Sequence, residues 1–445
     1  MTVTLRFAPS PTGFIHVGNI RTALMNALLA RQHNGTFYLR LDDTDTVRST
    51  DEFANAIQQD LKWLGLNYDD TFRQSDRMAR YDEIKQTLID AGRLYPCYET
   101  ADELERKRKR QLSKSLAPVY DRAALNLSDA EKTEFETSGR TPHWRFKLDL
   151  TDIHFHDLIR GDVRIDARSV SDPVLIREDG SYLYTLCSVI DDMDYHITHI
   201  VRGEDHVTNT AVQIQIFAAL NAKIPTFAHH PLLTDDKGEK LSKRIGGLSV
   251  KSLREQGLEP MTILSYLARI GTSDSVEPRT NIADIASGFD IGRTSNSPAR
   301  FVNDDMFALN AQICALYDYE QIKTRLHAIC PDADMDFWNG VKFNIKYFSD
   351  VKQWYDIIYN FTPVKSDIAQ HDFLKTALDI LPDAGTENFW KIWTKSIAEK
   401  TGRKGKDLFM PLRYALTAME HGPEMAVIIT LLGRDKIIQR IQNTF

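Results

Sequence analysis

Apolar positions at the start of the chain follow two spacings, one typical of strands and one typical of helices. Residues 3–7 form a short β-prone run, and residues 36–41 form a second. Between them, apolar residues over 20–28 recur every three or four positions, with Asn19 where a helix cap is expected. A further amphipathic helix is predicted over 53–64. This alternation of strands and helices predicts a parallel βαβ arrangement.

The pattern changes near residue 95 and changes again near residue 190. From 95 to 188, a charged helical stretch and short apolar segments replace the βαβ alternation. A strand over 195–202 and a helix over 207–220 then resume it, and from Ser249 onward the spacing is helical almost throughout. We therefore expect an α/β domain that is split by an insertion and followed by helices.

The loop between the first strand and the first helix carries the first candidate chemistry. His16 and Gly18 follow a proline-rich segment, at the point where the helix is expected to begin. The free amides and the dipole of a helix N-terminus attract an anion, His16 adds a donor, and Gly18 lets a phosphate approach the backbone. A surface loop with an incidental histidine would show the same pattern.

A cationic loop lies far downstream. Lys240, Lys243 and Arg244 fall within five residues, between an Asp-Asp-Lys-Gly turn and a pair of glycines. Such a loop suits a polyphosphate, because lysines neutralise oxygens that gain charge in a transition state, and Ser242 is a further donor. Taken alone, a charge run of this kind is also typical of a solvated surface.

Together the two loops resemble the signature motifs of class I aminoacyl-tRNA synthetases, here His16-Val17-Gly18-Asn19 and Lys240-Leu241-Ser242-Lys243-Arg244. Nearly the whole chain is similar, in order, to the bacterial glutamyl type. The helical C-terminal region favours that type over the glutaminyl enzymes, whose anticodon domains are β-barrels. Further similar segments are Arg6 to Gly13, Arg21 to Leu24, Leu39 to Asp45, Ile197 to His206 and Phe409 to Arg413.

The resemblance implies a domain organisation. The expected fold is α/β, with a Rossmann-type catalytic domain over 1–94 and 189–248 that is split by an α+β connective insertion over 95–188. The insertion would bind the tRNA acceptor end. A helical stem-contact region over 249–309 and an all-helical anticodon-binding region over 310–445 would follow.

The implied reaction is the ATP-dependent attachment of L-glutamate to tRNA. The substrate carboxylate attacks the α-phosphate of ATP, pyrophosphate leaves, and the terminal adenosine ribose hydroxyl then attacks the glutamyl-adenylate. Positioning and charge stabilisation drive such steps, so His16, Lys240 and Lys243 are the expected catalytic residues, with Mg²⁺ sharing the charge and Lys243 as the principal ATP lysine. The residues expected to bind ATP are these three with Gly18, Asn19, Leu241, Ser242 and His206.

Glutamate presents carboxylates and an ammonium, which arginines and an acid can bind together. The family usually has a glutamate where this chain has Asp42, a side chain shorter by roughly 1.5 Å. We expect a small backbone shift or a water to absorb the difference. Alternatively, Arg6 only pairs with a surface carboxylate and Tyr184 is buried core. By resemblance, the pocket consists of Arg6 and Arg202 at the acidic groups, Asp42 at the ammonium, and Tyr184, Ala8, Ser10 and Ser188 around them.

Composition sets bounds on class and location. The 445 residues include 42% hydrophobic and 26% charged residues, as in an ordinary soluble protein of two to four domains. The first six residues show no signal pattern, and the apolar run over 425–433 is too short for a bilayer. We therefore expect a cytoplasmic protein that does not contact membranes, and a monomer.

The net charge of −7 is unusual for a protein that binds nucleic acid, so the distribution of charge matters more. One basic block spans 106–110, and a second lies near the C-terminus. Either could be a solvated face. The second resembles the family's anticodon-binding region and is interrupted by glycines, so it is the one expected to contact tRNA. Its candidate tRNA-binding residues are Arg403, Lys404, Lys406 and Arg413.

The four cysteines are widely spaced and include no CxxC pair, so buried free thiols are expected. Some relatives carry zinc in the insertion, in a site that begins with a cysteine like Cys97. Here Glu99 stands two residues further on and the stretch 120–124 contains no thiol. The sequence therefore predicts no zinc.

Neighbouring acids also suggest a metal site. Asp43 and Asp45 lie two residues apart, and Asp191 and Asp192 are adjacent. We expect structural roles instead, with the first pair capping the next helix and the second joining the insertion to the nucleotide-binding domain.

Two other functions are compatible with parts of the sequence. A non-catalytic tRNA-binding paralogue could keep the fold, but the residues expected to act on ATP are all present. A ligase that forms adenylates without tRNA would not need the helical C-terminal third. The motifs do not reveal whether glutamate tRNA alone or also glutamine tRNA is the substrate.

Overall fold

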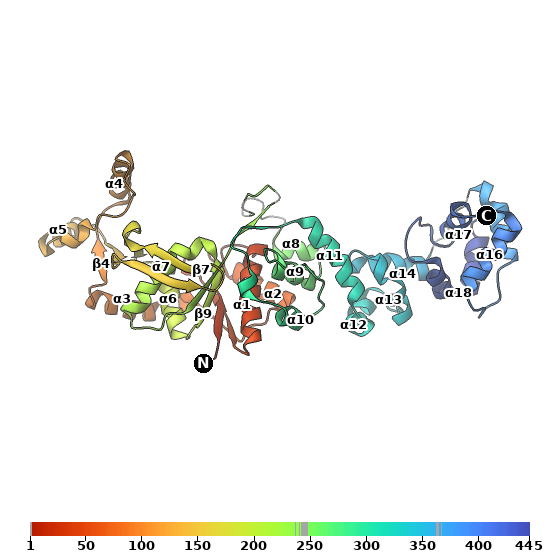
Figure 1. The fold of residues 1–445 in the computed structure, drawn as a ribbon, viewed down its shortest axis with the longest axis horizontal. Helices are drawn as coiled ribbons and strands as arrows, with labels where there is room; N and C mark the ends of the chain where they lie inside the picture. Colours follow the sequence, from red (N-terminus) through yellow and green to blue (C-terminus); the bar gives the residue numbers. More distant parts are fainter. Residues whose placement is uncertain (1, 236, 240, 242–247, 362–364, 366) are drawn as a thin grey trace. The chain divides into compact units, whose positions relative to one another are not determined.

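The computed structural model describes all residues except 1, 236, 240, 242–247, 362–364 and 366 (Figure 1). The chain divides into two compact units. The first comprises Met1–Gln256 and Ile263–Val302, and the second comprises Gly257–Thr262 and Asn303–Phe445. Among the helices that the structure describes, none has both the length and the apolar character needed to cross a membrane.

The strands lie in the first unit, where Figure 1 draws them in red through green. They are β1 (Thr4–Phe7), β2 (Thr36–Leu41), β3 (Asp70–Arg73), β4 (Leu94–Cys97), β5 (His143–Phe146), β6 (Asp152–Asp157), β7 (Gly161–Asp166), β8 (Val174–Ile176), β9 (His199–Gly203), β10 (Thr226–His230), β11 (Leu233–Thr234) and β12 (Ala299–Arg300).

The helices of both units follow the predicted distribution, with helices dominating after residue 249. They are α1 (Val17–Gln32), α2 (Asp51–Leu64), α3 (Met78–Asp90), α4 (Ala101–Ser113), α5 (Asp129–Thr137), α6 (Tyr184–Asp194), α7 (Val207–Ala219), α8 (Val250–Glu255), α9 (Pro260–Arg269), α10 (Ile282–Ser287), α11 (Asn303–Leu316), α12 (Tyr319–Ile329), α13 (Met335–Val341), α14 (Val351–Tyr359), α15 (His371–Asp379), α16 (Phe389–Thr401), α17 (Lys406–Thr417) and α18 (Met425–Gln442).

The parallel strands of the first unit have the order β3-β2-β1-β9-β10. β1 pairs with β2, β2 with β3 and β9 with β10, all in parallel. The amide of Thr198 donates to the carbonyl of Thr4 at 2.9 Å and so joins the two groups of strands. Apolar residues of β1 and β2 are buried, as expected for parallel strands covered on both faces. The order reverses between β1 and β9, the point where such sheets bind ligands.

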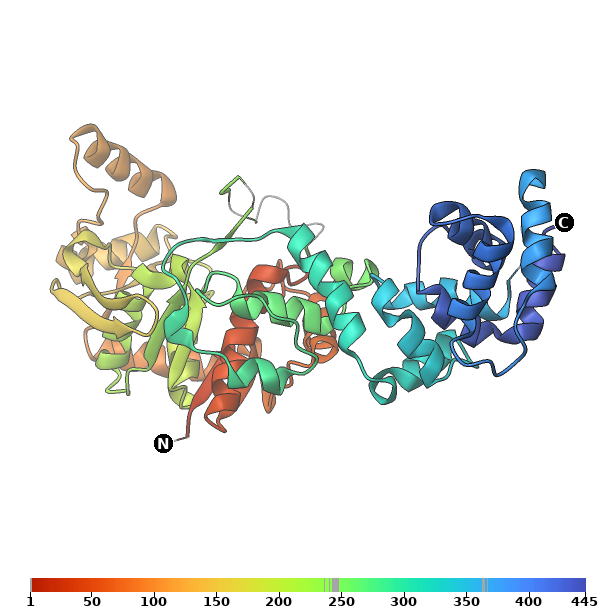
Figure 2. The same cartoon turned by 45° about the vertical axis from the view of Figure 1, so that its right-hand side comes forward.

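The insertion adds a second sheet and a hairpin. β4, β5 and β8 form an antiparallel sheet, whereas β6 and β7 form a hairpin that joins β10 through the pair Asp157 and Phe227. Figures 1 and 2 both show α4 projecting from these sheets. No residue of α4 is buried. The helix is therefore held by its caps and ion pairs and contributes nothing to a core.

Local deviations from the predicted elements occur where turns intervene. The strand expected over 195–202 begins at His199, because α6 runs to Asp194 and His196 turns the chain with a φ of 53°. The cap of α2 is Thr50, whose side chain accepts from the Phe53 amide at 3.3 Å. A cap of this kind contributes about 1 kcal/mol.

The second unit packs its helices around buried tryptophans. Trp338 of α13 donates its indole N–H to the carbonyl of Tyr317 at 3.0 Å, and Trp393 of α16 donates to Ala377 at 2.8 Å. Both side chains are fully buried, and their polar N–H groups are satisfied. The helices predicted near 372–381 and 388–398 are α15 and α16.

Candidate active site

A cavity of about 850 Å³ opens at the carboxyl ends of β1 and β9. Its walls come from the loop after β1, the N-terminus of α1, the residue after β2, the start of α6, and the segments after β9 and β10. The structure thus brings together residues from distant parts of the sequence. Among the expected site residues, its lining includes Arg6, Ala8, Ser10, His16, Gly18, Asn19, Asp42, Tyr184, Arg202, His206 and Leu241.

His16 caps α1, so the expectation that Asn19 does so is wrong. The Nδ1 atom of His16 accepts from the Gly18 amide at 3.0 Å, and the Asn19 side chain accepts from the His16 amide at 3.2 Å. Burial lowers the pKa of His16, which favours the neutral ring. Because Nδ1 accepts, the ring proton lies on Nε2. His16 therefore offers an N–H donor beside the anion-attracting amides of the helix.

Gly18 leaves the room that this cap needs. A Cβ atom at Gly18 would lie 2.9 Å from Cε1 of the His16 ring. Any larger residue would push the imidazole from its position over the first turn of α1. The space that the His16 ring occupies therefore requires a glycine at position 18, in addition to any approach of a phosphate.

Arg202 is a buried cation that is held by hydrogen bonds to neutral side chains. Its side chain is 5% exposed and donates to the Tyr184 hydroxyl at 3.1 Å, and to Thr210 and Gln213 at 2.8 and 2.7 Å. Among the residues that the structure describes, no carboxylate lies within ion-pair distance of it. Burial lowers its pKa. A negatively charged ligand group in the cavity would supply the missing counter-charge.

His229 and Asp157 support Arg202 from behind. The Nε atom of Arg202 donates to Nε2 of His229 at 3.2 Å, and Nδ1 of His229 lies 2.6 Å from the Asp157 carboxylate. Burial lowers the pKa of His229, so its ring is neutral and donates from Nδ1 to Asp157. Asp157 ends β6, and the insertion hairpin therefore helps to place Arg202.

Arg6 pairs with a buried acid while still lining the cavity. Its Nε and Nη2 atoms donate to the Asp192 carboxylate at 2.9 and 3.3 Å. Burial alone would raise the pKa of Asp192, but the Arg6 and Arg40 guanidinium groups outweigh it and hold that pKa below its ordinary value. The alternative of an ion pair at the surface does not hold, because both side chains are buried.

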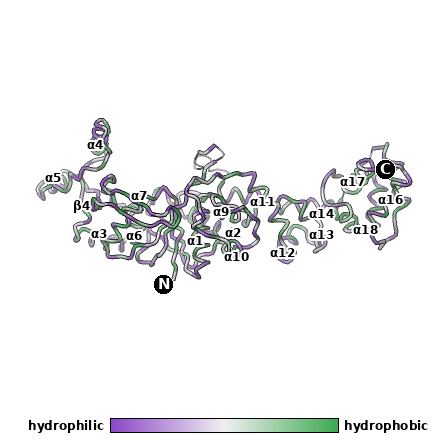
Figure 3. The backbone as a smooth tube through the Cα atoms, viewed as in Figure 1, coloured by the Kyte–Doolittle hydropathy of each residue, from purple (hydrophilic) through white to green (hydrophobic). Residues whose placement is uncertain are grey.

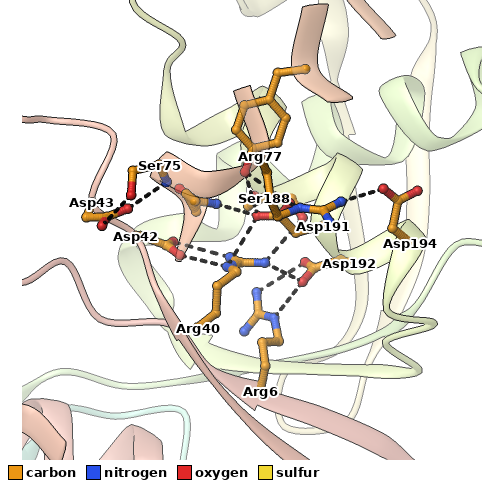
Figure 4. A network of polar contacts seen from close by, with 12 residues as sticks. Arg6, Arg40, Asp42, Asp43, Ser75, Arg77, Ser188, Asp191, Asp192 and Asp194 are labelled. Carbon is orange, nitrogen blue, oxygen red and sulfur yellow. Dashed lines mark hydrogen bonds and ion pairs between the residues drawn. The ribbon is translucent and has the colours of Figure 1, made fainter. Parts of the chain in front are cut away.

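Asp42 also lines the cavity, and Arg40 holds it. The Arg40 guanidinium donates to both carboxylate oxygens of Asp42, at 2.6 and 3.2 Å (Figure 4). Burial raises the pKa of Asp42 to about 6, with Arg40 opposing the shift. The amide of Asp42 donates to the Pro9 carbonyl at 3.0 Å, which joins the end of β2 to the loop after β1.

Two further expected residues lie at different depths. Tyr184 and His206 both line the cavity, with ring centroids 5.4 Å apart, and burial lowers the pKa of His206 to about 4. Ser188 is fully buried and outside the lining; its hydroxyl accepts from Gln213 at 2.7 Å. Gln213 also accepts from Arg202, and the Ser188 carbonyl accepts from Arg40 at 3.5 Å, so Ser188 is connected to the cavity only through other side chains.

The expected lysine loop lies mostly outside the described residues. Lys240, Ser242 and Lys243 belong to the part that is not described. Leu241 is described and lines the cavity, and before it the Asp235 carboxylate accepts from the amides of Lys237 and Glu239, both at 2.9 Å.

Comparison with known proteins identifies the family. The family model for the catalytic domain of class I tRNA synthetases (E and Q) matches residues 2–307, and an anticodon binding domain matches residues 323–445. The chain belongs to the class I tRNA synthetases of this E and Q family. The resemblance drawn from the motifs is thereby confirmed, as is the expected α/β catalytic fold with a helical anticodon-binding region.

Relatives and solved structures agree along the whole chain. Glutamate–tRNA ligase 1 of Maricaulis maris is 50% identical over 98% of this chain and 98% of that protein. Glutamate–tRNA ligase 2 of Bartonella henselae is 50% identical over 99% of each. A crystal structure of a glutamate tRNA ligase from Elizabethkingia meningosepticum has a TM-score of 0.86 at 24% identity, covering 100% of this chain and 99% of that one. The last likeness shows the shared fold.

In this synthetase the neighbouring acids are structural, as expected, but the predicted cap is wrong. Asp43 accepts from the amide and hydroxyl of Ser75 at 2.8 and 2.9 Å, and Asp45 pairs with Arg48. Neither caps α2. Asp191 and Asp192, by contrast, join α6 to the strands and to α3. Their side-chain partners all lie within 1–94, so these bonds hold the nucleotide-binding domain together, and the expected link to the insertion stays a prediction. Among the described residues, no group of three or more histidines, cysteines or acids is arranged to hold a metal ion.

Sequence reasoning did not assign roles to several residues of the synthetase site. The motifs assign no role to Arg40, although a charged residue inside a buried parallel strand is unusual and is a signal of a polar partner. Phe14 lines the cavity and packs edge-on against Phe53 at 5.2 Å. Asp157 and His229 lie too far from Arg202 in sequence for any local pattern to have revealed them.

The expected tRNA-binding residues of the synthetase differ in exposure. Lys404 and Lys406 are exposed. Arg403 lies 4.2 Å from the Phe373 ring centroid and donates to Gln370 at 2.6 Å. Arg413 donates to the Pro423 carbonyl at 3.0 Å, and burial lowers its pKa. The two lysines are thus the better-placed pair for a ligand, and Arg413 stabilises its own loop.

The four cysteines of the synthetase are free and buried, which confirms the expected thiols. Cys97 lies 3.7 Å from the hydroxyl of Tyr120, which also donates to Glu99 at 2.9 Å. Lys107 donates to the same Glu99 oxygen at 3.1 Å. Hydrogen bonds and an ion pair therefore occupy the segment where some relatives begin a zinc site; the absence of zinc stays a prediction.

Proposed function

We propose that this synthetase attaches L-glutamate to tRNA in two steps, through a glutamyl-adenylate. The observation that carries the proposal is that one cavity holds both His16, a donor at a helix N-terminus, and Arg202, a buried cation with no carboxylate partner among the described residues. The first fits a nucleotide phosphate and the second an acidic amino acid. Relatives named glutamate–tRNA ligase, 50% identical over nearly the full chain, support the same reaction.

The strand side of the cavity would bind glutamate. Arg6 and Arg202 would hold its acidic groups, and the Asp42 carboxylate would hold its ammonium. Tyr184 would keep Arg202 oriented, and Ala8 and Ser10 would line the pocket alongside. Because Ser188 is buried and contacts Gln213 and Arg40, it would act on glutamate only indirectly, through Arg202 or Asp42.

The helix side would bind ATP. His16 and the first amides of α1 would hold phosphate oxygens as charge develops on them, with Gly18, Asn19, Leu241 and His206 around the nucleotide. Lys240, Ser242 and Lys243 would add charge and a donor; their part of this proposal rests on the sequence motif. In the first step the glutamate α-carboxylate attacks the α-phosphate and pyrophosphate leaves; in the second a ribose hydroxyl attacks the anhydride and AMP leaves.

Magnesium would enter with the nucleotide. The cavity lining contains the acids Asp42 and Asp205, and the described residues contain no metal-binding cluster. The donor set therefore does not form a protein site for the ion. We propose that ATP phosphates supply most ligands of Mg²⁺ and derive no step through it.

The rest of the chain would bind tRNA. The proposed regions are an insertion over 95–188 for the acceptor end, a stem-contact region over 249–309 and an anticodon-binding region over 310–445. Within the insertion, α4 is strongly hydrophilic, as Figure 3 shows, and a cavity of about 440 Å³ beside it is rich in cations. The cations lining that cavity are Lys107, Arg108, Arg110, Lys114 and Arg145.

Phosphate contacts of this kind carry affinity without sequence information. Arg110 and Lys114 are exposed, as are Lys404 and Lys406 in the second unit. Arg403 and Arg413 would orient the segments around those lysines. We propose that the enzyme works as a cytoplasmic monomer on glutamate tRNA, and that glutamine tRNA is a second substrate to be tested.

Pyrophosphate exchange tests the proposal. Full-length protein is mixed with ATP, L-glutamate and labelled pyrophosphate, with and without tRNA, and label in ATP is measured together with glutamyl-tRNA. Exchange that requires tRNA, followed by charging, is expected. No exchange in either mixture would point to a non-catalytic paralogue, and full exchange without tRNA to an adenylating ligase. Initial charging rates on purified glutamate and glutamine tRNAs then define the tRNA specificity.

A further inference from the structure

One buried guanidinium connects the two ends of the proposed glutamate pocket. Arg40 is fully buried and does not belong to the cavity lining. Its Nε and Nη2 atoms donate to Asp42, and its Nη1 donates to Asp192 at 2.8 Å and to the Ser188 carbonyl at 3.5 Å. Its Nε atom also lies 3.8 Å from the Asp191 carboxylate, so Arg40 faces three carboxylates and donates hydrogen bonds to two of them, Asp42 and Asp192.

Asp192 is the second connecting group. Its Oδ1 atom accepts from Arg40 at 2.8 Å and from the Nε atom of Arg6 at 2.9 Å, and its Oδ2 accepts from Nη2 of Arg6. Figure 4 shows the resulting chain, Arg6 to Asp192 to Arg40 to Asp42. Its two outer members line the cavity and its two inner members do not.

The adjacent Asp191 fixes α6 in a separate way. Its carboxylate accepts from Gln74 and Arg77, both at 2.7 Å, and from the hydroxyl of Tyr81 at 3.0 Å. These partners belong to the segment 74–81, which leads into α3. Asp191 therefore anchors the helix, which leaves Asp192 aimed at the strands.

Charge and geometry explain why this chain depends on arginine. A guanidinium presents a rigid fork that binds one carboxylate with two donors while a third donor reaches another. A lysine ammonium at position 40 would keep the charge but lose the fixed fork. An unbalanced buried charge is costly, so each member of the chain needs its neighbour.

We infer that Arg40 and Asp192 are positioning residues that set the selectivity of this pocket for a ligand with both an acidic side chain and an α-ammonium. The inference rests on the proposed function, because it assigns Arg6 to the acidic groups of glutamate and Asp42 to the ammonium. Arg40 places the carboxylate that receives the ammonium. Asp192 places the arginine that receives an acidic group, and it links that arginine to Arg40.

Direct binding of two ligands tests this assignment. Isothermal titration calorimetry on the full chain, without tRNA, compares L-glutamate with glutarate, which lacks the ammonium. In Arg40→Lys, the Kd for L-glutamate is expected to rise about ten-fold. The preference for L-glutamate over glutarate, measured as the ratio of the two Kd values, should fall at least about five-fold and approach that of Asp42→Asn. In Asp192→Asn, both ligands are expected to weaken about ten-fold, because both carry the acidic groups that Arg6 receives.

Asp194→Asn is the matched control. Asp194 lies on the same helix and pairs with Arg80 at 3.0 Å, but it does not contact Arg6 or Arg40. Asp194→Asn should lower the free energy of unfolding without changing the ratio of the Kd for glutarate to the Kd for L-glutamate. Circular dichroism establishes which variants are folded, and if Arg40→Lys unfolds, Asp192→Asn decides.

The outcomes separate this inference from the proposed function. Wild-type affinities and ratios in a folded Arg40→Lys or Asp192→Asn would overturn the positioning roles, even if the wild type charges tRNA. If the variants show the expected changes in Kd but the wild type charges no tRNA, the proposed reaction is refuted and the positioning roles stand. A wild-type chain that binds no L-glutamate would overturn both.

Discussion

The two sides of the cavity hold their functional groups in different ways. On the strand side, buried charged partners fix both groups: Asp192 lies 186 residues from Arg6, whereas Arg40 lies two residues before Asp42. On the helix side, His16 is fixed by the amide of Gly18 and the side chain of Asn19, within its own turn. The proposed receptor of the acidic group therefore depends on a partner from distant sequence, whereas the proposed phosphate site is assembled within one helical turn. Substitutions on the two sides should therefore fail differently.

Removal of Arg6 should have the largest effect. Arg6→Ala deletes a receptor of the acidic group and leaves Asp192 with Arg40 as its remaining cation, so kcat/KM for glutamate is expected to fall about 10³-fold, or roughly 4 kcal/mol. Initial charging rates at saturating ATP and tRNA measure it. The KM for ATP should change little, because Arg6 lies on the strand side. A loss below ten-fold would contradict the assignment.

His16 should affect rate more than binding. His16→Ala removes the Nε2–H donor, and kcat is expected to fall about 100-fold, or roughly 2.7 kcal/mol, while the KM for glutamate stays within about two-fold. Single-turnover adenylate formation is the measurement. His16→Asn is the matched variant, since asparagine also caps helices well: it should restore thermal stability but not the wild-type rate. Full recovery of rate would assign His16 to the cap alone.

Acid should weaken glutamate binding before it weakens ATP binding. Burial and the nearby Asp191 raise the pKa of Asp42 to about 6, against the effect of Arg40 and Arg6. The ionised form, which is proposed to receive the ammonium, is therefore lost as the pH falls through 6. Glutamate affinity is expected to fall about ten-fold between pH 7 and pH 5. Calorimetric titrations across this range check it, with Asp42→Asn as the pH-independent reference.

Stability should show the opposite sign for the same group. Because the folded-state pKa of Asp42 lies above its ordinary value of 3.8, its contribution to the free energy of unfolding is present below pH 4 and is lost as the pH rises through 6. Urea unfolding of wild type and Asp42→Asn at pH 4.5 and 7.5 measures this effect. Relative to Asp42→Asn, the wild type should have a lower free energy of unfolding at pH 7.5 than at pH 4.5. A difference between the two proteins that does not change with pH would contradict the prediction.

Loss of the Tyr184 hydroxyl should be the mildest change. Tyr184→Phe removes one acceptor from Arg202, which keeps Thr210, Gln213 and His229. One such bond contributes about 1 kcal/mol, so the KM for glutamate is expected to rise about five-fold with kcat unchanged. Steady-state charging measures it. An effect as large as that of Arg6→Ala would show that the hydroxyl contacts the substrate itself.

Local patterns predicted the elements, and the motifs predicted most of the cavity lining. Periodicity located β2 and α2 closely, because their apolar residues face a core in regular steps. It failed at the cap of α1, where a histidine takes the place usually held by a small polar residue. It failed again at the start of β9, where the turn after α6 has no glycine and His196 adopts a positive φ instead.

The buried partners of the site could not be predicted in the same way. Arg6 and Asp192 are 186 residues apart, and Arg202 meets His229 across neighbouring strands. Such pairs follow from strand order and register, which one sequence does not specify residue by residue. Arg40 is the exception, because its position within a buried parallel strand predicts that it has a charged or polar partner, although not which one.

The solitary helix α4 has a consequence for how this chain can change. None of its residues is buried, so no substitution on its outward face opens a cavity in a core. Glu103 and Lys107 are the exceptions that hold the helix in place, through Arg140 and Glu99. If α4 contacts tRNA as proposed, exchanges of its exposed cations should therefore change RNA affinity with little effect on the stability of the fold.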